Sequence, residues 1–275
     1  MFRIFRKIRN DILGSTKTSR YLMYAAGELV LVVAGILIAL QINNWNEERI
    51  GQQEIRSHAL NLSAAIERDM EMLMPVEMQV RTSIRQGEEL AKYIRENAVA
   101  EMNNADLFFL STIIGYRPYA WNRAALEQLK AVGGLRQMRN KDLAERISDY
   151  DALTQHLDQD YREDEETARA MFDLLVRVVD RNYDLGESED DLEWIDGYSD
   201  EYVDDRLKSY RDTPLYQRLA NERRPLLSDD LAEIRRLANR SLSFANGTKP
   251  RPDIELPRLR QFGAEIQAMI EAEYR

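Results

Sequence analysis

Two different hydrophobic patterns follow one another near the start of the chain. Residues 29–40 contain no strongly polar side chain, so a helix there would be apolar on every side. Residues 45–97 instead carry apolar side chains three or four positions apart, which predicts a helix with one buried face. These apolar residues are Ile55, Ala59, Leu62, Ile66, Leu73, Val76, Val80, Ile84, Ala91 and Ile94. No glycine or proline lies within residues 41–50, so we expect one helix through both patterns, kinked or interrupted near Pro75.

The first pattern has the length of a membrane span. A helix over residues 21–42 would be about 33 Å long, and the hydrocarbon core of a bilayer is about 30 Å thick. Tyr21 and Tyr24 at one end and Trp45 at the other are aromatic residues of the kind that anchor a helix at the membrane interfaces. We therefore predict a single transmembrane helix over residues 21–44. The alternative is a buried helix of a soluble core.

The distribution of charge predicts the orientation of this span. Residues 1–20 carry six basic residues and one acidic residue, whereas the whole chain has 38 basic and 48 acidic residues. Basic residues beside a span remain in the cytoplasm. We therefore expect a protein of the cytoplasmic membrane, with its N-terminus inside and residues 45–275 in the periplasm or outside the cell. The sequence ALQINNWNEE after the span has no small-residue cleavage site, which predicts an uncleaved signal anchor.

The first residues of the chain combine apolar and basic side chains. Phe2, Phe5, Ile8 and Ile12 recur at helical spacing, with basic residues between them. This pattern predicts a short amphipathic helix in contact with membrane lipid, and the alternative is a charged flank without structure of its own. No comparable basic cluster occurs elsewhere, so we expect no nucleic-acid partner.

The remainder of the chain is predicted to form further helices. Their expected ranges are 106–114, 122–133, 140–183, a short helix from Pro214, 228–245 and 257–274, with an acidic loop over 184–205. Asn122 and Ser228 are the predicted N-caps, and Gly133-Gly134 is a predicted helix end. Sustained strand-like alternation is missing. We therefore predict an all-α fold, with segments 1–20 (basic), 21–44 (transmembrane) and 45–275 (an extracytoplasmic helical bundle).

Candidate chemistry is sparse in this sequence. The chain has no cysteine, which excludes disulfides and thiolate sites, and it carries no phosphate-loop, dinucleotide, zinc-protease or serine-hydrolase motif. His156 could share one helix face with Asp160 and Glu163 and bind a divalent metal, but a solvated charged face is the interpretation we favour. The acids of residues 187–196 lack the spacing of a calcium loop and are expected to be solvated. We therefore predict no cofactor and no metal.

Glu28 is the one charged residue inside the predicted span. It lies about one turn from the cytoplasmic boundary, where a charge costs less than the roughly 3 kcal/mol expected at the centre. In the first interpretation Glu28 is neutral or reaches back to interfacial water and Arg20; in the second it takes part in a contact between helices. Glu28, Gly35, Ala39 and Ile42 fall on one stripe, and the four-residue spacing of the two small residues lets helices approach closely. The second interpretation predicts a homo-oligomer.

Two stretches resemble a known family. GELVLVVAGILIALQINNWNEER, residues 27–49, is similar to the N-terminal signature of an uncharacterised family of bacterial single-pass membrane proteins, a domain of unknown function. ALEQLKAVGGLRQMRNKDLAERISDYD, residues 125–151, is similar to the L-K-x-x-G-x-L-R and N-K-x-L segment of its members. The resemblance implies a single-pass topology and brings no catalytic residues.

Several function classes are compatible with these features. The first is a membrane-tethered helical module of the bacterial envelope that interacts with a partner, senses a ligand or serves as a scaffold. The second is an extracytoplasmic hydrolase that uses carboxylates or a metal, and a third is an oligomeric pore lined by Glu28. Because no nucleophile, cofactor or metal motif is recognisable, we favour the first class, in which the chain is not an enzyme and binds another envelope protein or a second copy of itself.

Overall fold

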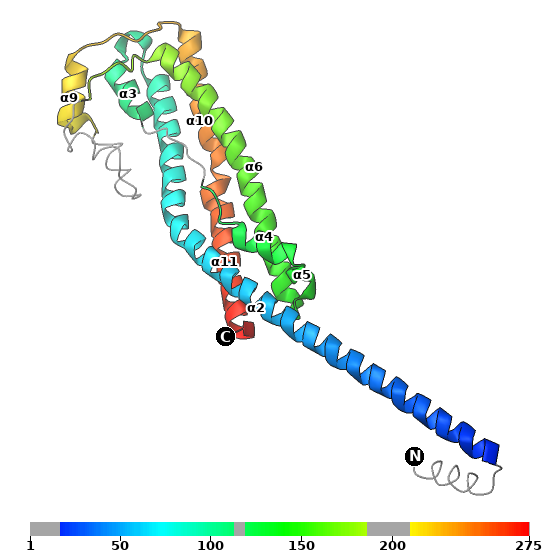
Figure 1. Ribbon diagram of the computed structural model, residues 1–275. Helices are drawn as coiled ribbons and strands as arrows, with labels where there is room; N and C mark the ends of the chain where they lie inside the picture. The colour runs from blue at the N-terminus through cyan, green and yellow to red at the C-terminus, as the bar shows by residue number, and fades with distance from the viewer. Residues whose placement is uncertain (1–16, 113–118, 186–209, 275) are drawn as a thin grey trace. The chain divides into compact units, whose positions relative to one another are not determined.

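The computed structural model describes residues 17–112, 119–185 and 210–274 (Figure 1). Every regular element in these ranges is a helix, which confirms the predicted all-α class. The elements are α2 (Lys17–Glu96), η1 (Val99–Glu101), α3 (Asn104–Thr112), α4 (Ala124–Ala131), α5 (Gly134–Gln137), α6 (Lys141–Val178), η2 (Tyr210–Asp212), α9 (Pro214–Asn221), α10 (Leu231–Thr248), η3 (Arg251–Glu255) and α11 (Leu256–Tyr274). Contacts divide the chain into two compact units, Met1–Ser57 and His58–Arg275, which we call the N-terminal unit and the bundle unit.

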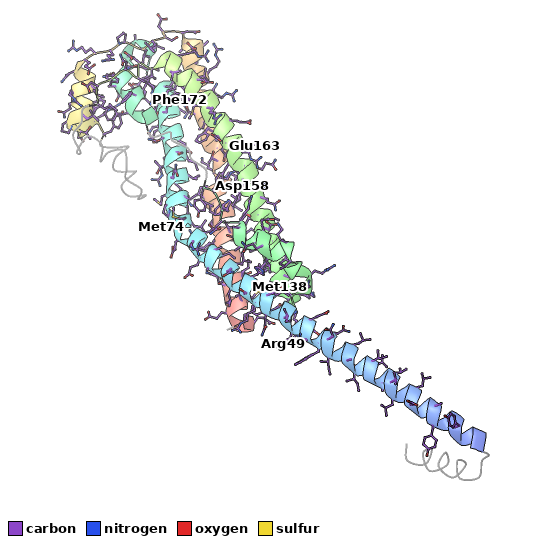
Figure 2. All side chains as sticks on the ribbon, viewed as in Figure 1. Arg49, Met74, Met138, Asp158, Glu163 and Phe172 are labelled. Carbon is purple, nitrogen blue, oxygen red and sulfur yellow. The ribbon has the colours of Figure 1, made fainter. Side chains whose placement is uncertain are left out.

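The N-terminal unit contains the first part of α2, and the large apolar side chains of its residues 29–42 are exposed (Figure 2). Leu29 exposes 66% of its surface, Leu31 75% and Ile42 60%. Among the described residues, this is the one helix that is long and apolar enough to cross a membrane by length and composition. The predicted amphipathic helix at Phe2–Ile12 lies outside the described residues.

The bundle unit begins with the second part of α2, where the predicted buried face is confirmed. Leu62, Ile66, Leu73 and Ile94 expose 5% of their surface or less. The helix is not interrupted at Pro75, although proline removes one backbone hydrogen bond, but it changes direction beside Met74 (Figure 2).

The α10–η3–α11 segment packs antiparallel to α2. Gly87 lies against the start of this segment, and Gly263 lies against Met70 near its end. A Cβ atom on Gly87 would lie 2.8 Å from the carbonyl oxygen of Ser241, and one on Gly263 would lie 2.7 Å from the sulfur of Met70. Two glycines therefore allow the helices to approach closely at both ends of the contact.

The third long helix of the bundle is α6. Asn140 caps its N-terminus by accepting a hydrogen bond from the backbone N–H of Leu143. Arg146 lies 2.8 Å from Glu265 near one end of α6, and Arg177 lies 3.5 Å from Glu233 near the other. This helix is therefore also antiparallel to α10–η3–α11, and the core lies between the three rods (Figure 1).

Several predicted boundaries are wrong. The residue before α4 is Arg123 rather than Asn122, and Asp230 rather than Ser228 caps α10. The predicted helix 140–183 ends at Val178, and most of the predicted acidic loop lies outside the described residues. The segment before residue 257 is helical instead of a linker.

This last difference arises from η3, which is a π-helix. Pro250 and Pro252 have no backbone N–H, so they cannot make the four-residue hydrogen bonds of an α-helix. The chain widens instead, and the N–H of Leu256 donates to the carbonyl of Arg251, five residues earlier. Arg81 of α2 donates a 3.0 Å hydrogen bond to the carbonyl of Pro252. Two prolines thus change the geometry of the rod without ending it.

Candidate functional site

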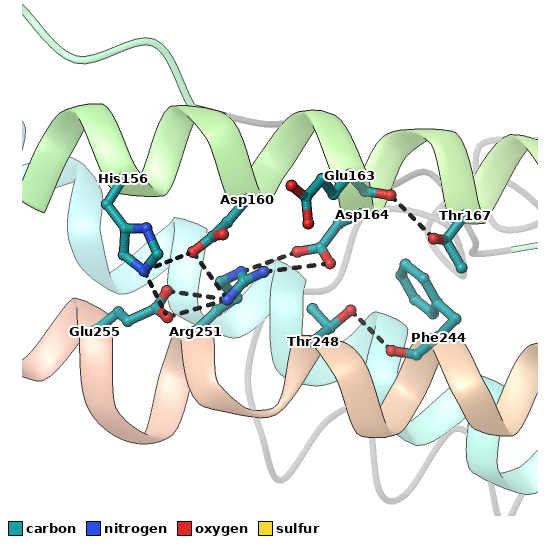
Figure 3. A network of polar contacts seen from close by, with 9 residues as sticks. All are labelled: His156, Asp160, Glu163, Asp164, Thr167, Phe244, Thr248, Arg251 and Glu255. Atoms are coloured by element: carbon teal, nitrogen blue, oxygen red, sulfur yellow. Dashed lines mark hydrogen bonds and ion pairs between the residues drawn. The ribbon is translucent and has the colours of Figure 1, made fainter.

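A buried arginine lies between α6 and η3 (Figure 3). Arg251 exposes 7% of its surface. Its Nε lies 3.0 Å from Asp164, and its Nη1 lies 3.1 Å from Asp160 and 3.0 Å from Glu255. Burying a charge is costly unless it is paired and hydrogen-bonded. One guanidinium group therefore serves three carboxylates.

The helices place these side chains by simple spacing. His156, Asp160 and Asp164 are four residues apart on α6, so they follow one another along one face of that helix. Arg251 and Glu255 belong to the widened turn η3 and face them from the opposite rod. The antiparallel packing of α6 against η3 brings the two sets together.

His156 lies at the outer edge of this cluster. Its Nε2 is 3.2 Å from Oδ2 of Asp160 and 3.8 Å from Oε1 of Glu255. The imidazole is 58% exposed, whereas Asp160 as a residue is only 8% exposed. Oδ2 of Asp160 is buried and accepts no hydrogen bond of good geometry. An imidazole nitrogen and two carboxylate oxygens therefore converge on one point at the rim of the cluster.

The pKa of Glu255 reflects the burial and the charges of this cluster. Burial raises the pKa of the Glu255 carboxyl, and the nearby charge of Asp160 raises it further. Arg251 and His156 act in the opposite direction and only partly offset these effects on the pKa. Because the pKa of Glu255 is raised, additional positive charge beside its carboxyl group is favoured.

A polar pocket of about 660 Å³ opens beside His156. Two arginines and two glutamines contribute to its wall, together with acidic side chains. The residues that line it include Arg123, Gln155, His156, Asp158, Gln159 and Arg162. The exposed side of the imidazole is thus accessible to solutes.

The structure changes the predicted grouping of His156, Asp160 and Glu163. It brings the first two together, but Glu163 accepts a 3.3 Å hydrogen bond from Gln159 on the surface of α6, and Glu255 takes its place. The favoured interpretation of a solvated face is wrong for Asp160, which is buried. Arg251 and Glu255 were missed because periodicity along α6 gives no information about which rod faces it.

A separate buried carboxylate, outside the Arg251 cluster, belongs to α2. Asp69 is 2% exposed and accepts hydrogen bonds from the hydroxyls of Tyr119 (2.9 Å) and Tyr150 (3.3 Å) and from the backbone N–H of Asn122 (3.2 Å). Burial raises its pKa, while these hydrogen bonds and the charge of Arg123 lower it less strongly. Burial, together with the contact with Asp69, raises the pKa of Tyr119 to about 12. Asp69 thus joins α2 to the segment before α4 and to α6.

Another buried carboxylate, Asp106, lies in α3. It accepts hydrogen bonds from the hydroxyls of Tyr93 (3.0 Å) and Tyr210 (2.6 Å) and from Nε of Arg211 (2.9 Å). These contacts fasten α3 and η2 to the end of α2. The arrangement fits a structural role.

The predicted membrane-helix residues all lie on the first part of α2. Glu28, Gly35, Ala39 and Ile42 are exposed, and a Cβ atom at Gly35 would meet nothing within 4 Å. The predicted interfacial anchors Tyr21, Tyr24 and Trp45 expose 82, 79 and 65% of their surface. The stripe is therefore accessible to another helix or to lipid.

The chain matches no protein-family model, no curated protein and no solved structure.

Proposed function

We propose that this chain is a membrane-anchored helical module of the bacterial envelope that works by binding a partner. Residues 21–44 would form the span, with the N-terminus in the cytoplasm and the bundle unit outside. The observation that carries the proposal is the exposure of the apolar side chains of residues 29–42. Apolar surface is stabilised by about 25 cal/mol for each Å² removed from water, and a bilayer would cover this surface on every side.

The charge distribution supports the orientation. Six basic residues precede the apolar segment, and the chain as a whole has a net charge of −10. The resemblance of residues 27–49 to single-pass bacterial proteins is consistent with the same topology. Both arguments concern the position of the protein and are independent of its activity.

The buried polar groups support a binding module over an enzyme. Asp69 and Asp106 each accept several hydrogen bonds from neighbouring elements, which is the arrangement expected of groups that hold a bundle together. The exposed stripe of Glu28, Gly35 and Ala39 supports self-association through the membrane, since small residues let helices approach and a carboxyl group can hydrogen-bond across the contact.

The topology is tested with a reporter enzyme that is active only outside the cytoplasm. Fused to Arg275 of the full chain, the reporter should be active, and the fusion should remain in the membrane fraction after alkaline carbonate extraction. The matched control fuses the same reporter after Arg20 and should be silent. A soluble fusion, or an inactive reporter on a stable C-terminal fusion, would overturn the proposal.

Self-association is tested by the size of the detergent-solubilised protein. Glu28→Ala and Gly35→Leu should each shift the protein toward monomer, because both remove a feature of the proposed helix contact. Val33→Leu, on the opposite side of the helix, is the matched control and should keep the wild-type size. If the wild type is monomeric, or if both stripe variants keep its size, the stripe does not hold an oligomer together.

A further inference from the structure

We propose that His156, Asp160 and Glu255 form a binding site for one divalent transition-metal ion such as Zn²⁺. The site lies on the bundle unit and joins α6 to η3 (Figure 3). It goes beyond the proposed membrane module and does not depend on it. Imidazole nitrogen and carboxylate oxygen are common ligands of Zn²⁺.

The first argument is the spacing of the three ligand atoms. Bonds of about 2.0–2.2 Å in a tetrahedral site place ligand atoms about 3.3–3.6 Å apart. Nε2 of His156 lies 3.2 Å from Oδ2 of Asp160 and 3.8 Å from Oε1 of Glu255. All three atoms lie within 4.8 Å of one another. The ligand set therefore has the dimensions of a metal site with little rearrangement.

The second argument is that Oδ2 of the buried Asp160 accepts no hydrogen bond. This residue is 8% exposed, and its Oδ2 accepts no hydrogen bond although two nitrogen atoms lie 3.1 and 3.2 Å away. The nitrogen groups of Arg251 and His156 are therefore close to the oxygen but are not directed at it. A buried acceptor without a hydrogen bond calls for an explanation, and a bound ion is one such explanation. A metal ion would use the lone pair that the two nitrogen atoms leave free.

Arg251 has a supporting role in this site. Its Nη1 contacts both ligating carboxylates, and its Nε contacts Asp164, so the guanidinium fixes their orientation. Groups that orient ligands in this way affect metal affinity strongly. The charges also match, because three carboxylates balance one guanidinium and one divalent ion.

The site is accessible from solution. His156 is the exposed ligand, and it also lines the polar pocket beside α6. Three protein ligands leave the fourth position of a tetrahedral ion for water or for another molecule. The inferred site therefore resembles an open metal centre more than a closed structural one.

The test uses the full chain in detergent, purified without a histidine tag and stripped with a chelator. Co²⁺ is added as a probe, because tetrahedral Co²⁺ with a nitrogen ligand absorbs visible light, and Zn²⁺ is then used to displace it. The wild type should bind one equivalent. His156→Ala should weaken binding at least about tenfold, and Glu255→Gln should weaken it as well. His156 is exposed, so its variant should remain folded, which circular dichroism checks.

Glu163→Gln is the matched control, since Glu163 lies on the same helix as His156 but outside the cluster. It should keep wild-type affinity. The proposal is overturned if the wild type binds clearly less than one equivalent, or if His156→Ala binds as tightly as the wild type. It is equally overturned if Glu163→Gln weakens binding and Glu255→Gln does not.

Discussion

Asp69 and Asp160 are both buried carboxylates of the bundle unit, yet they are stabilised in opposite ways. Asp69 accepts hydrogen bonds from uncharged donors, namely two tyrosine hydroxyls and one backbone N–H. Asp160 lies beside the charged group of Arg251 and the imidazole of His156, and its Oδ2 accepts no hydrogen bond. Full hydrogen bonding makes the first site a fixed joint. Incomplete hydrogen bonding leaves the second site able to accept a further ligand.

The comparison also concerns the energetic cost of each arrangement. A carboxylate held by neutral donors can be protonated without leaving a charged partner behind. At the other site the shared group is a cation, and removing the guanidinium of Arg251 leaves three carboxylate charges without that partner. Substitutions at the two sites should therefore lower the free energy of unfolding by different amounts.

The largest expected effect is that of Arg251→Met. It removes the cation that two buried carboxylates, Asp160 and Asp164, share with the partly buried Glu255, so we expect a loss of about 3–5 kcal/mol in the free energy of unfolding. The measurement is denaturant unfolding of the full chain in detergent with a chelator present. Arg235→Met, at an exposed position of α10, is the control and should change stability by no more than about 0.5 kcal/mol. Equal losses in the two variants would contradict the importance of the shared cation.

A smaller effect is expected for Asp69→Asn. The amide group presents donors to a site that already consists of donors, which should cost about 1–3 kcal/mol. The loss should also depend on pH. Burial raises the pKa of Asp69 above its ordinary value of 3.8. The wild type therefore has a stabilising contribution that is complete below about pH 3.8 and is lost as pH rises through the raised pKa.

The difference in stability between wild type and Asp69→Asn should therefore be largest at acidic pH and shrink toward neutral pH. Unfolding curves at several values between about pH 3 and 7 measure it. A difference that grows as pH rises would show that the folded state favours the ionised carboxylate, against this prediction.

The smallest effect is expected for Tyr119→Phe. It removes one hydrogen bond of 2.9 Å to Asp69 and should cost about 1 kcal/mol. A double-mutant cycle with Asp69→Asn isolates the contact, because the loss from Tyr119→Phe should nearly vanish when Asp69 is already replaced. Simple addition of the two losses would mean that the hydroxyl acts independently of Asp69.

Sequence patterns predicted the elements of this fold better than its contacts. The apolar face of α2 and the start of a helix at Asn140 follow from local spacing, and both are confirmed. The π-helix η3 was not predicted, since its proline-rich sequence is equally typical of a linker. The joint at Asp69 links residues 50 and 81 positions away, and no periodicity within one helix reports on such contacts.

The candidate metal cluster illustrates the same limit. His156 and Asp160 were recognisable because both lie on one helix, four residues apart. Glu255 was not, because it faces them from a helix about one hundred residues later in the chain. Arg251 and Glu255 are also four residues apart. This charged pair within a proline-rich segment was the sequence feature that could have indicated the second half of the cluster.

The antiparallel contact of α2 with α11 sets the order of events during biosynthesis. Glu77 of α2 pairs with Arg260 of α11, 183 residues later, so the ribosome finishes one face of the core long before its partner exists. At about 5–20 residues per second, the apolar face of α2 would wait roughly 10–40 s for α11. The contacts that close the bundle are thus distant in sequence, a topology associated with slow folding. A nascent or C-terminally truncated chain would expose this face, and chaperones or proteases would have time to act on it.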